Sequence, residues 1–250
     1  NLNEMKNISK KITVVVSTCD SYSVLWDHFS KCFDKYWETE CDVIFVSETK
    51  SHPFYKTITP GNLPWGERNR IAIMDLKTEY IFWILEDYFL SRPIKEEDII
   101  RYIKDFEKLE MERLQIGPKG PNKHIESYLN QSINQRPKFQ YEKTLSSEKY
   151  SVCLQPSIWR KDYILNILDK QYTPWEFELI GSLKNNSDKI YFDKSVKNHL
   201  FFNAVRKKHL RNLSWAIAKI DQVLEKVFYD KLPFKYSKGL SSFLRHEKID

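Results

Sequence analysis

Apolar runs alternate with stretches of helical periodicity through the first part of the chain. The runs cover residues 12–16, 42–46 and 80–85 and consist mainly of β-branched and aromatic residues. Strands that are buried on both faces of a parallel sheet have this pattern. Helical spacing lies between the runs, at 24–36 and 65–78. The pattern therefore predicts an α/β domain in which helices flank a mixed, mostly parallel sheet.

The pattern is weaker in the second half. Residues 117–149 are polar with little periodicity, which predicts a functional loop containing short helices. A strand at 150–155 is expected to lead into a helix around 163–168, and a further strand is expected at 189–192. Apolar residues return at helical spacing at 213–228, where they predict an amphipathic helix.

Polar and acidic residues follow each of the three apolar runs. Thr18 and Asp20 follow the first run, Glu48 the second, and Glu86 and Asp87 the third. Because α/β sheets bind ligands at the carboxyl ends of their parallel strands, we expect these residues to share one crevice. A carboxylate pair there is costly to desolvate unless a cation meets it. The simpler alternatives are that Asp20 caps the next helix and that the pair only faces water.

The composition and the absence of certain motifs argue against several classes of protein. The chain has 250 residues and 6 glycines, and no glycine-rich loop follows the first run. This argues against dinucleotide-binding Rossmann enzymes, P-loop NTPases and sugar-phosphate nucleotidylyltransferases. The four cysteines lack metal-site spacing, which predicts buried thiols in a reducing compartment. That compartment favours the cytoplasm. Since no run approaches the roughly 20 apolar residues of a membrane span, a soluble protein is expected.

The net charge of +6 is concentrated toward the end of the chain. Lys207 and Lys208 belong to this basic part, which predicts that residues 206–250 form a basic amphipathic extension packed on a domain of residues 1–205. Such a surface suits phosphates, anionic lipid or nucleic acid. A nucleic-acid-binding protein is therefore an alternative, but it leaves the acidic pair unexplained.

Two short motifs flank the third apolar run. Glu67-Arg68-Asn69 opens the preceding helix, and Leu85-Glu86-Asp87-Tyr88 ends the run. They resemble the Ala-Arg-Asn helix and the Leu-Asp-x-Asp strand end of GT-A glycosyltransferases, with Tyr88 at the last carboxylate position. The resemblance implies a GT-A-like fold in which Glu86 and Asp87 hold Mn²⁺ or Mg²⁺ on a nucleotide-diphosphate sugar, with His199 or His209 as a candidate further ligand. The simpler alternative for either histidine is an exposed side chain without a metal role. It implies a nucleotide-binding set made of Thr18, Asp20, Glu48, Arg68, Asn69, Lys207 and Lys208.

Residues 173–178, Thr-Pro-Trp-Glu-Phe-Glu, contain two candidates for a catalytic carboxylate. Thr173 with Glu176 three positions later matches a capping box, with proline at the first helical position. This gives Glu176 a structural role and leaves Glu178 as the better general base, whereas a helix that began elsewhere would free Glu176 instead. With the Leu-Gln-Pro-x-Ile-Trp stretch upstream, the segment resembles bacterial surface-polysaccharide glycosyltransferases of capsule and lipopolysaccharide over roughly residues 12–205.

The sequence thus predicts an inverting glycosyltransferase with a nucleotide-sugar donor and a glycan or lipid-linked glycan acceptor. By the resemblance, Glu178 takes the proton of the acceptor hydroxyl. Peripheral contact with the inner face of the cell membrane is expected for a lipid-linked acceptor, and no nucleic-acid partner is expected. A GT-A-like scaffold without activity is the other alternative, because Tyr88 replaces a carboxylate.

Overall fold

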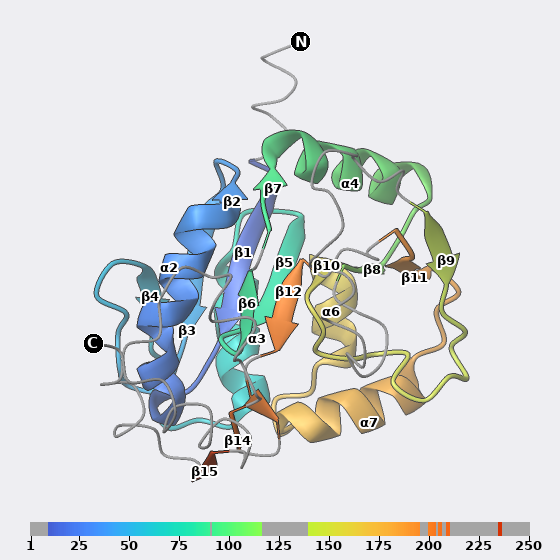
Figure 1. The fold of residues 1–250 in the computed structure, drawn as a ribbon. Coiled ribbons are helices and arrows are strands. Elements are labelled where there is room, and N and C mark those ends of the chain that lie inside the picture. The colour runs from blue at the N-terminus through green and yellow to red at the C-terminus, as the bar shows by residue number, and fades with distance from the viewer. Residues whose placement is uncertain are drawn as a thin grey trace.

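The computed structural model describes residues 10–90, 92–116 and 140–195, and the short stretches 200–203, 205–206, 209–210 and 235–236. An eight-stranded sheet forms its centre, with helices on both faces (Figure 1). In spatial order its strands are β4 (Lys56–Ile58), β3 (Asp42–Val46), β1 (Ile12–Ser17), β5 (Tyr80–Leu85), β10 (Ser157–Arg160), β8 (Arg113–Gln115), β11 (Ile190–Asp193) and β9 (Tyr141–Lys143).

The helices and the smaller strand pairings complete the architecture. The helices are η1 (Asp20–Leu25, a 3-10 helix), α2 (Trp26–Tyr36), α3 (Trp65–Asp75), α4 (Glu96–Lys108), α6 (Lys161–Ile167) and α7 (Pro174–Lys184). The smaller pairings join β2 (Trp37–Glu38) to β7 (Ile94–Lys95), β6 (Tyr88–Leu90) to β12 (Phe201–Asn203), and β14 (His209–Leu210) to both β13 (Val205–Arg206) and β15 (Lys235–Tyr236). No helix within the described ranges is both long and apolar enough to cross a membrane.

Strand β1 lies inside a parallel half of the sheet. It pairs in parallel with β3, where Val15 faces Ile44, and with β5, where Val15 faces Trp83. Strand β4 extends this parallel half beyond β3. Strand β10 is antiparallel to β5 and β8, whereas β11 is parallel to β8 and antiparallel to β9. The predicted mixed, mostly parallel sheet with flanking helices is confirmed.

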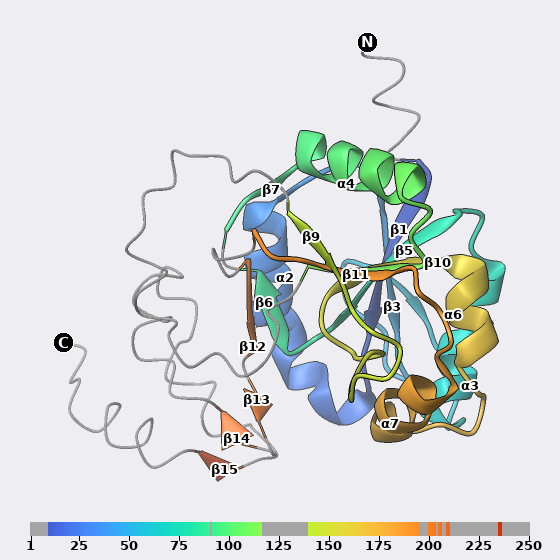
Figure 2. The ribbon, with the colours of Figure 1, turned by 90° about the vertical axis from the view of Figure 1, so that its right-hand side faces the viewer.

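The apolar run of β5 supplies side chains to two hydrophobic cores. Phe82 and Ile84 pack with residues of α2 and α4, whereas Ile81 and Trp83 pack with residues of α3, α6 and α7. All four side chains are at most 2% exposed. Figure 2 shows α2 and α3 on opposite sides of the sheet. Because neighbouring side chains of a strand point to opposite faces, a strand that is covered on both faces is apolar at every position.

The strand expected at 150–155 is wrong in position, because β10 begins after this segment. The Val152 amide and carbonyl both bond with the Ser182 hydroxyl of α7, at 3.0 Å each. The Leu154 amide donates to Glu178 Oε1 of the same helix at 2.8 Å. Since side chains of α7 satisfy these backbone groups, the segment needs no neighbouring strand.

The other expected elements lie close to their predicted places. Strand β11 corresponds to the run at 189–192, α6 to the helix around 163–168, and α3 ends somewhat earlier than the predicted helix at 65–78. Most of the loop at 117–149 and the amphipathic helix at 213–228 lie outside the described residues, as does most of the proposed C-terminal extension.

Helix α3 begins in close contact with the loop that leads into α7. The Gly66 amide donates to the Tyr172 carbonyl at 2.9 Å. A Cβ atom on Gly66 would lie 2.1 Å from the carbonyl oxygen of Asp169, far inside any van der Waals contact. The neighbouring Trp65 indole donates to Ser17 Oγ at the end of β1, at 3.0 Å. The absence of a side chain at Gly66 therefore allows α3 to reach the strand ends.

His52 is a buried histidine in an aromatic cluster under α2. It is 6% exposed, and its ring centroid lies 4.5 Å from that of Phe45. Its Nδ1 accepts from the amides of Phe54 and Tyr55 at 3.1 Å each, and its Nε2 lies 2.8 Å from Ser30 Oγ. Because Nδ1 is an acceptor, the ring is neutral with its proton on Nε2. Burial lowers the pKa of His52 and reinforces this state.

Acidification is expected to destabilise the fold through His52. The pKa of His52 in the folded state lies below the unfolded value of about 6.5, so the unfolded chain binds the proton first, and this stability is lost as the pH falls below about 6.5. His52→Asn keeps an acceptor oxygen but does not titrate. Urea unfolding at about pH 7 and about pH 5 should show a smaller loss of unfolding free energy for His52→Asn than for the wild type. Equal losses would contradict the neutral, buried ring.

Candidate active site

The ends of β1, β3 and β5 meet at one edge of the sheet. The Thr18 amide donates to the Val46 carbonyl at 3.0 Å, and the Asp20 amide donates to the Glu48 carboxylate. The Thr18 side chain also forms a hydrogen bond with Glu86. The structure thus brings together the polar residues that follow the three apolar runs.

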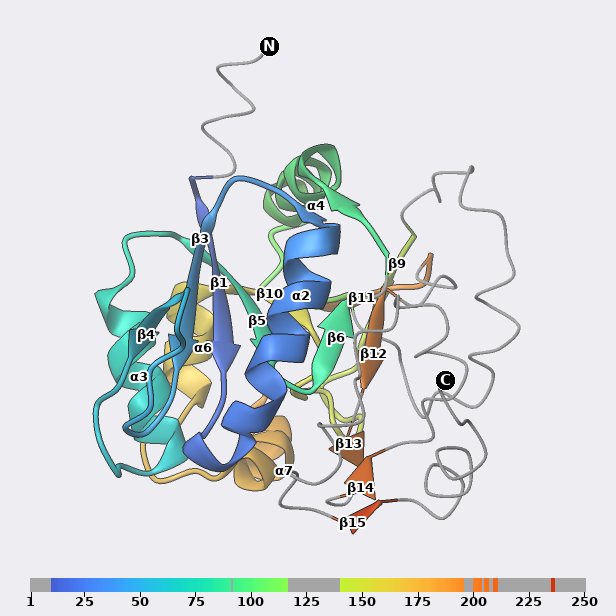
Figure 3. The ribbon, with the colours of Figure 1, turned by 60° about the vertical axis from the view of Figure 1, so that its left-hand side comes forward.

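Glu86 and Asp87 occupy the turn between β5 and β6, where Glu86 is buried and Asp87 is half-buried. Glu86 is 6% exposed. Asp87 Oδ2 accepts from Asn203 Nδ2 at 3.2 Å, whereas Asp87 Oδ1 is buried without a hydrogen-bond partner. Figure 3 shows β6 and β12 side by side; Asp87 directly precedes β6, and Asn203 is the last residue of β12. The pair therefore combines a buried acid and a half-buried acid, and one buried carboxylate oxygen has no hydrogen-bond partner among the described residues.

The acidic pair has no basic partner in the part of the chain that the structure describes. Burial and then the charge of Asp87 raise the pKa of Glu86 well above its ordinary value. Burial also raises the pKa of Asp87, although the Asn203 hydrogen bond opposes this effect. Either a proton or a cation would relieve two adjacent carboxylates in such a place.

The chemistry of the two carboxylates suits a divalent metal ion. Oxygen ligands suit Mg²⁺ and Mn²⁺, and Mg²⁺ commonly binds through one or two carboxylates together with substrate phosphates. Among the described residues no third His, Cys, Asp or Glu joins Glu86 and Asp87 to form a complete metal cluster. The described residues therefore suit a metal whose remaining ligands come from phosphate and water.

Asp20 fastens the segment after β1 to the segment after β3. Its carboxylate accepts from Ser47 Oγ at 2.8 Å, from Thr49 Oγ1 at 2.5 Å, and from the amides of Thr49 and Lys50 at 3.1 and 2.9 Å. Burial acts to raise the pKa of Asp20, but these hydrogen bonds outweigh it and lower the pKa. The structure uses Asp20 as a loop anchor, and its contact with a nucleotide stays a prediction.

An ion pair between Arg68 and Glu48 joins the start of α3 to the same edge of the sheet. Arg68 Nη2 lies 2.9 Å from Glu48 Oε1, and the two side chains are only 7% and 19% exposed. Arg68 Nη1 donates to the Leu63 carbonyl at 2.8 Å. Asn69 Nδ2 donates to the Trp65 carbonyl at 2.9 Å, and its Oδ1 is buried without a partner. Arg68 is thus already paired with a carboxylate, whereas Asn69 retains an unsatisfied acceptor.

Glu176 has the structural role that its spacing predicts. Helix α7 begins after Thr173, with Pro174 in its first turn. Glu176 Oε2 accepts from the Thr173 amide at 2.8 Å, and the Glu176 amide donates to Thr173 Oγ1 at 3.2 Å. The capping box is confirmed, and the exposed Glu176 side chain caps its own helix.

Glu178 points inward from the same helix. Its Oε1 accepts from the Leu154 amide, and its side chain is partly buried. Burial raises the pKa of Glu178, while the Leu154 hydrogen bond and the charge of Arg113 oppose the increase. The pKa of Tyr88 is raised by burial and then by the charges of Asp87, Cys153 and Glu178. Tyr88, which directly follows the acidic pair, is therefore within electrostatic reach of Glu178.

Comparison with known proteins gives the fold but no sequence relative. No family model matches the chain, and no curated protein matches it. Among solved structures, S. aureus TarS 1–349 in complex with UDP has a TM-score of 0.51 at 14% identity, over 94% of this chain and 70% of that chain. The fold is GT-A-like.

Two further structures match less well. S. aureus TarS 1–349 in complex with UDP-GlcNAc has a TM-score of 0.44 at 14% identity, over 76% of this chain and 53% of that chain. A cytidylyltransferase from Leptospira borgpetersenii has a TM-score of 0.45 at 10% identity, over 96% of this chain and 99% of that chain. The chain spans 60% of the length of another TarS 1–349 structure.

Several predicted site residues lie outside the described residues of the GT-A-like domain. These are His199, Lys207 and Lys208. Their assignments as metal ligand and nucleotide contacts stay predictions. The sequence also missed Asn203, which lies beside Asp87, and Arg113, which lies near Glu178. Both are polar residues next to apolar neighbours in short strands, and this is a signal that could have indicated them.

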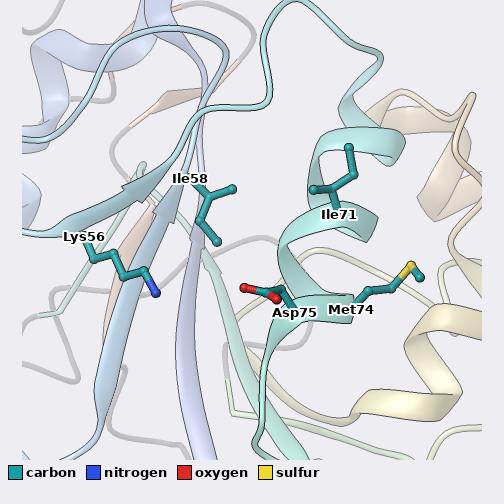
Figure 4. A pocket seen from close by; sticks show the side chains of 5 residues that line it. All are labelled: Lys56, Ile58, Ile71, Met74 and Asp75. Atoms are coloured by element: carbon teal, nitrogen blue, oxygen red, sulfur yellow. The ribbon is translucent and has the colours of Figure 1, made fainter.

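A separate hollow lies on the outside of the GT-A-like domain, between α3 and the edge strand β4 (Figure 4). Its volume is about 500 Å³. It is lined by Lys56, Ile58, Ile71, Met74 and Asp75. Helix α3 begins at the strand ends and leads back to the start of β5, so its second half faces away from Glu86 and Asp87. The hollow is therefore separate from the acidic pair.

Proposed function

We propose that this protein transfers a sugar from a nucleotide-diphosphate sugar to a hydroxyl group of a surface-glycan acceptor, with inversion at the anomeric carbon. The observation that carries the proposal is the carboxylate pair at the carboxyl edge of a GT-A-like sheet, where Glu86 is buried and Asp87 half-buried, with Glu178 within electrostatic reach of the adjacent Tyr88. The TarS structures in complex with UDP and UDP-GlcNAc support a nucleotide-sugar donor.

In this proposal Glu178 is the general base. As the acceptor oxygen attacks the anomeric carbon, Glu178 takes the hydroxyl proton, and the bond from the anomeric carbon to the diphosphate oxygen breaks. The partly buried carboxylate has a raised pKa, which suits a group that must bind a proton during the reaction. The Leu154 amide fixes one carboxylate oxygen, leaving the other for the acceptor.

The acidic pair would bind the donor substrate. Glu86 and Asp87 would bind Mn²⁺ or Mg²⁺ together with the donor diphosphate, and the bound ion would offset the negative charge on the departing diphosphate. The Asn203 amide keeps one Asp87 oxygen in place and leaves Oδ1 available. Thr18, Glu48 and Asn69 line the same edge and would contact the nucleoside.

A nucleoside diphosphate is expected to stabilise the protein, and Mn²⁺ is expected to increase the effect. A ligand that binds only the folded state at 100 times its Kd adds about 2.7 kcal/mol to the unfolding free energy, which corresponds to a Tm increase of several degrees. Thermal unfolding with millimolar UDP, GDP, CDP or dTDP measures the stabilisation by the nucleotide. Repeating each measurement with Mn²⁺ and with a chelator measures the contribution of the metal.

Asp87→Asn provides the matched control for the metal. It keeps shape and removes one carboxylate charge, so it should lose the Mn²⁺-dependent part of the shift and keep the rest. If no nucleoside diphosphate changes the Tm of the wild type, the donor site is wrong. Shifts that a chelator leaves unchanged would reject only the metal role of the pair.

A further inference from the structure

Arg113 places a fully buried positive charge near the candidate base. It lies on β8 and is 0% exposed. In the described part of the structure no carboxylate forms an ion pair with it. Burying an unpaired guanidinium is costly, and apolar residues often stabilise such a position as well or better. The charge is therefore not explained by stability alone.

The guanidinium holds the irregular segment that precedes β10. Arg113 Nη1 donates to the Ser151 carbonyl at 3.0 Å, and Nη2 lies 3.2 Å from the Cys153 carbonyl and 2.8 Å from Cys153 Sγ. Its other partners are Gln115 Oε1, Ser157 Oγ and the face of the Trp159 ring. Arg113 thus fixes the backbone on both sides of Val152.

The same segment holds Glu178 from the other side. Between Arg113 and α7, the segment offers the Leu154 amide to Glu178 Oε1 at 2.8 Å. The Ser182 hydroxyl of α7 bonds with both backbone groups of Val152 at 3.0 Å. A continuous chain of hydrogen bonds therefore runs from Arg113 through the segment to the Glu178 carboxylate.

The charge of Arg113 also reaches Glu178 directly. Burial raises the pKa of Glu178, and the positive charge of Arg113 opposes this increase. Glu178 in turn affects Tyr88 on β6, whose pKa also responds to the charges of Asp87 and Cys153. Arg113 is the only positive charge among these groups in the described structure.

We propose that Arg113 is a positioning residue for Glu178, because it orders the segment whose Leu154 amide holds the carboxylate and supplies the positive charge facing it. This inference rests on the proposed function, since it takes Glu178 as the base. The residue acts through Glu178 and contacts neither the donor nor the acceptor.

The pH dependence of transfer separates this role from a purely structural one. The substitution Arg113→Met removes the charge and the hydrogen bonds, so Glu178 should stay protonated to a higher pH. We expect kcat/KM to fall about tenfold on the acidic limb of its pH profile and to recover toward alkaline pH. Arg113→Lys keeps the charge, so its acidic limb should stay at the wild-type pH while its kcat falls through poorer positioning.

The outcomes distinguish the inference from the proposed function. The folded state of each variant is first checked by thermal unfolding, and Arg113→Gln, which also removes the charge, replaces Arg113→Met if Arg113→Met does not fold. An unshifted acidic limb in Arg113→Met, or a shifted one in Arg113→Lys, would overturn the role of Arg113. If Glu178→Gln itself keeps wild-type turnover, the base assignment fails instead, whatever the Arg113 variants do.

Discussion

Replacing Glu178 with glutamine is expected to reduce turnover by about 10²- to 10⁴-fold while donor affinity stays near the wild-type value. Glutamine has the same shape, and its Oε1 can still accept the Leu154 amide hydrogen. It cannot take the proton of an attacking hydroxyl. Steady-state transfer assays, combined with titration of the nucleoside diphosphate, separate loss of chemistry from loss of binding.

Glu176→Gln is the matched control, two positions away on the same helix. Glutamine also serves in a capping box, so its turnover should stay close to the wild type, and even Glu176→Ala should cost only about 1 kcal/mol of stability. The confirmed start of α7 after Thr173 is the basis of this contrast. A nearly active Glu178→Gln beside an inactive but folded Glu176→Gln would show that the other carboxylate is the base.

Gly66→Ala is expected to have the largest effect on stability, about 3 kcal/mol of unfolding free energy or more. The added Cβ would lie 2.1 Å from the carbonyl oxygen of Asp169 and 3.2 Å from two further backbone carbons. A flexible side chain could move away, but a backbone carbonyl can yield only if α3 or the loop before α7 shifts. Chemical denaturation at neutral pH measures the loss.

Gly181→Ala is the comparison, because Gly181 is also buried and lies inside α7. Its Cβ would meet a Val152 side-chain atom at 3.3 Å, and alanine raises helix propensity by about 1 kcal/mol relative to glycine. The two effects oppose each other, so the change in unfolding free energy should be small. If Gly66→Ala were as stable as Gly181→Ala, the close approach of α3 to residue Asp169 would be refuted.

Local patterns predicted most of the parallel half of the sheet. The run at 80–85 is apolar at every position because β5 packs against helices on both faces. A run without polar residues can be recognised in a single sequence. The capping box at Thr173 could also be predicted from the sequence, because both partners lie within one helical turn. The acidic pair could be found for the same reason, since its charge contrasts with the run that precedes it.

The missed features depend on contacts that are distant in sequence. Segment 150–155 looks like a strand, but Ser182 and Glu178 satisfy its backbone from a helix about 30 residues later. Asp20 was expected to contact a nucleotide or to cap a helix, yet the structure binds it to Ser47, Thr49 and Lys50. Spacing along the chain cannot show which donors a fold will bring to one carboxylate.

The pairing of β6 with β12 has a consequence for the order in which the site can form during synthesis. The parallel strands β1, β3, β4 and β5 all lie within the first 90 residues, so a ribosome releases them early. Asp87, however, receives its hydrogen bond from Asn203, which is 116 residues further along the chain. A nascent chain therefore carries the acidic pair without its amide donor until β12 has emerged, and the site around Asp87 is completed after the sheet that supports it.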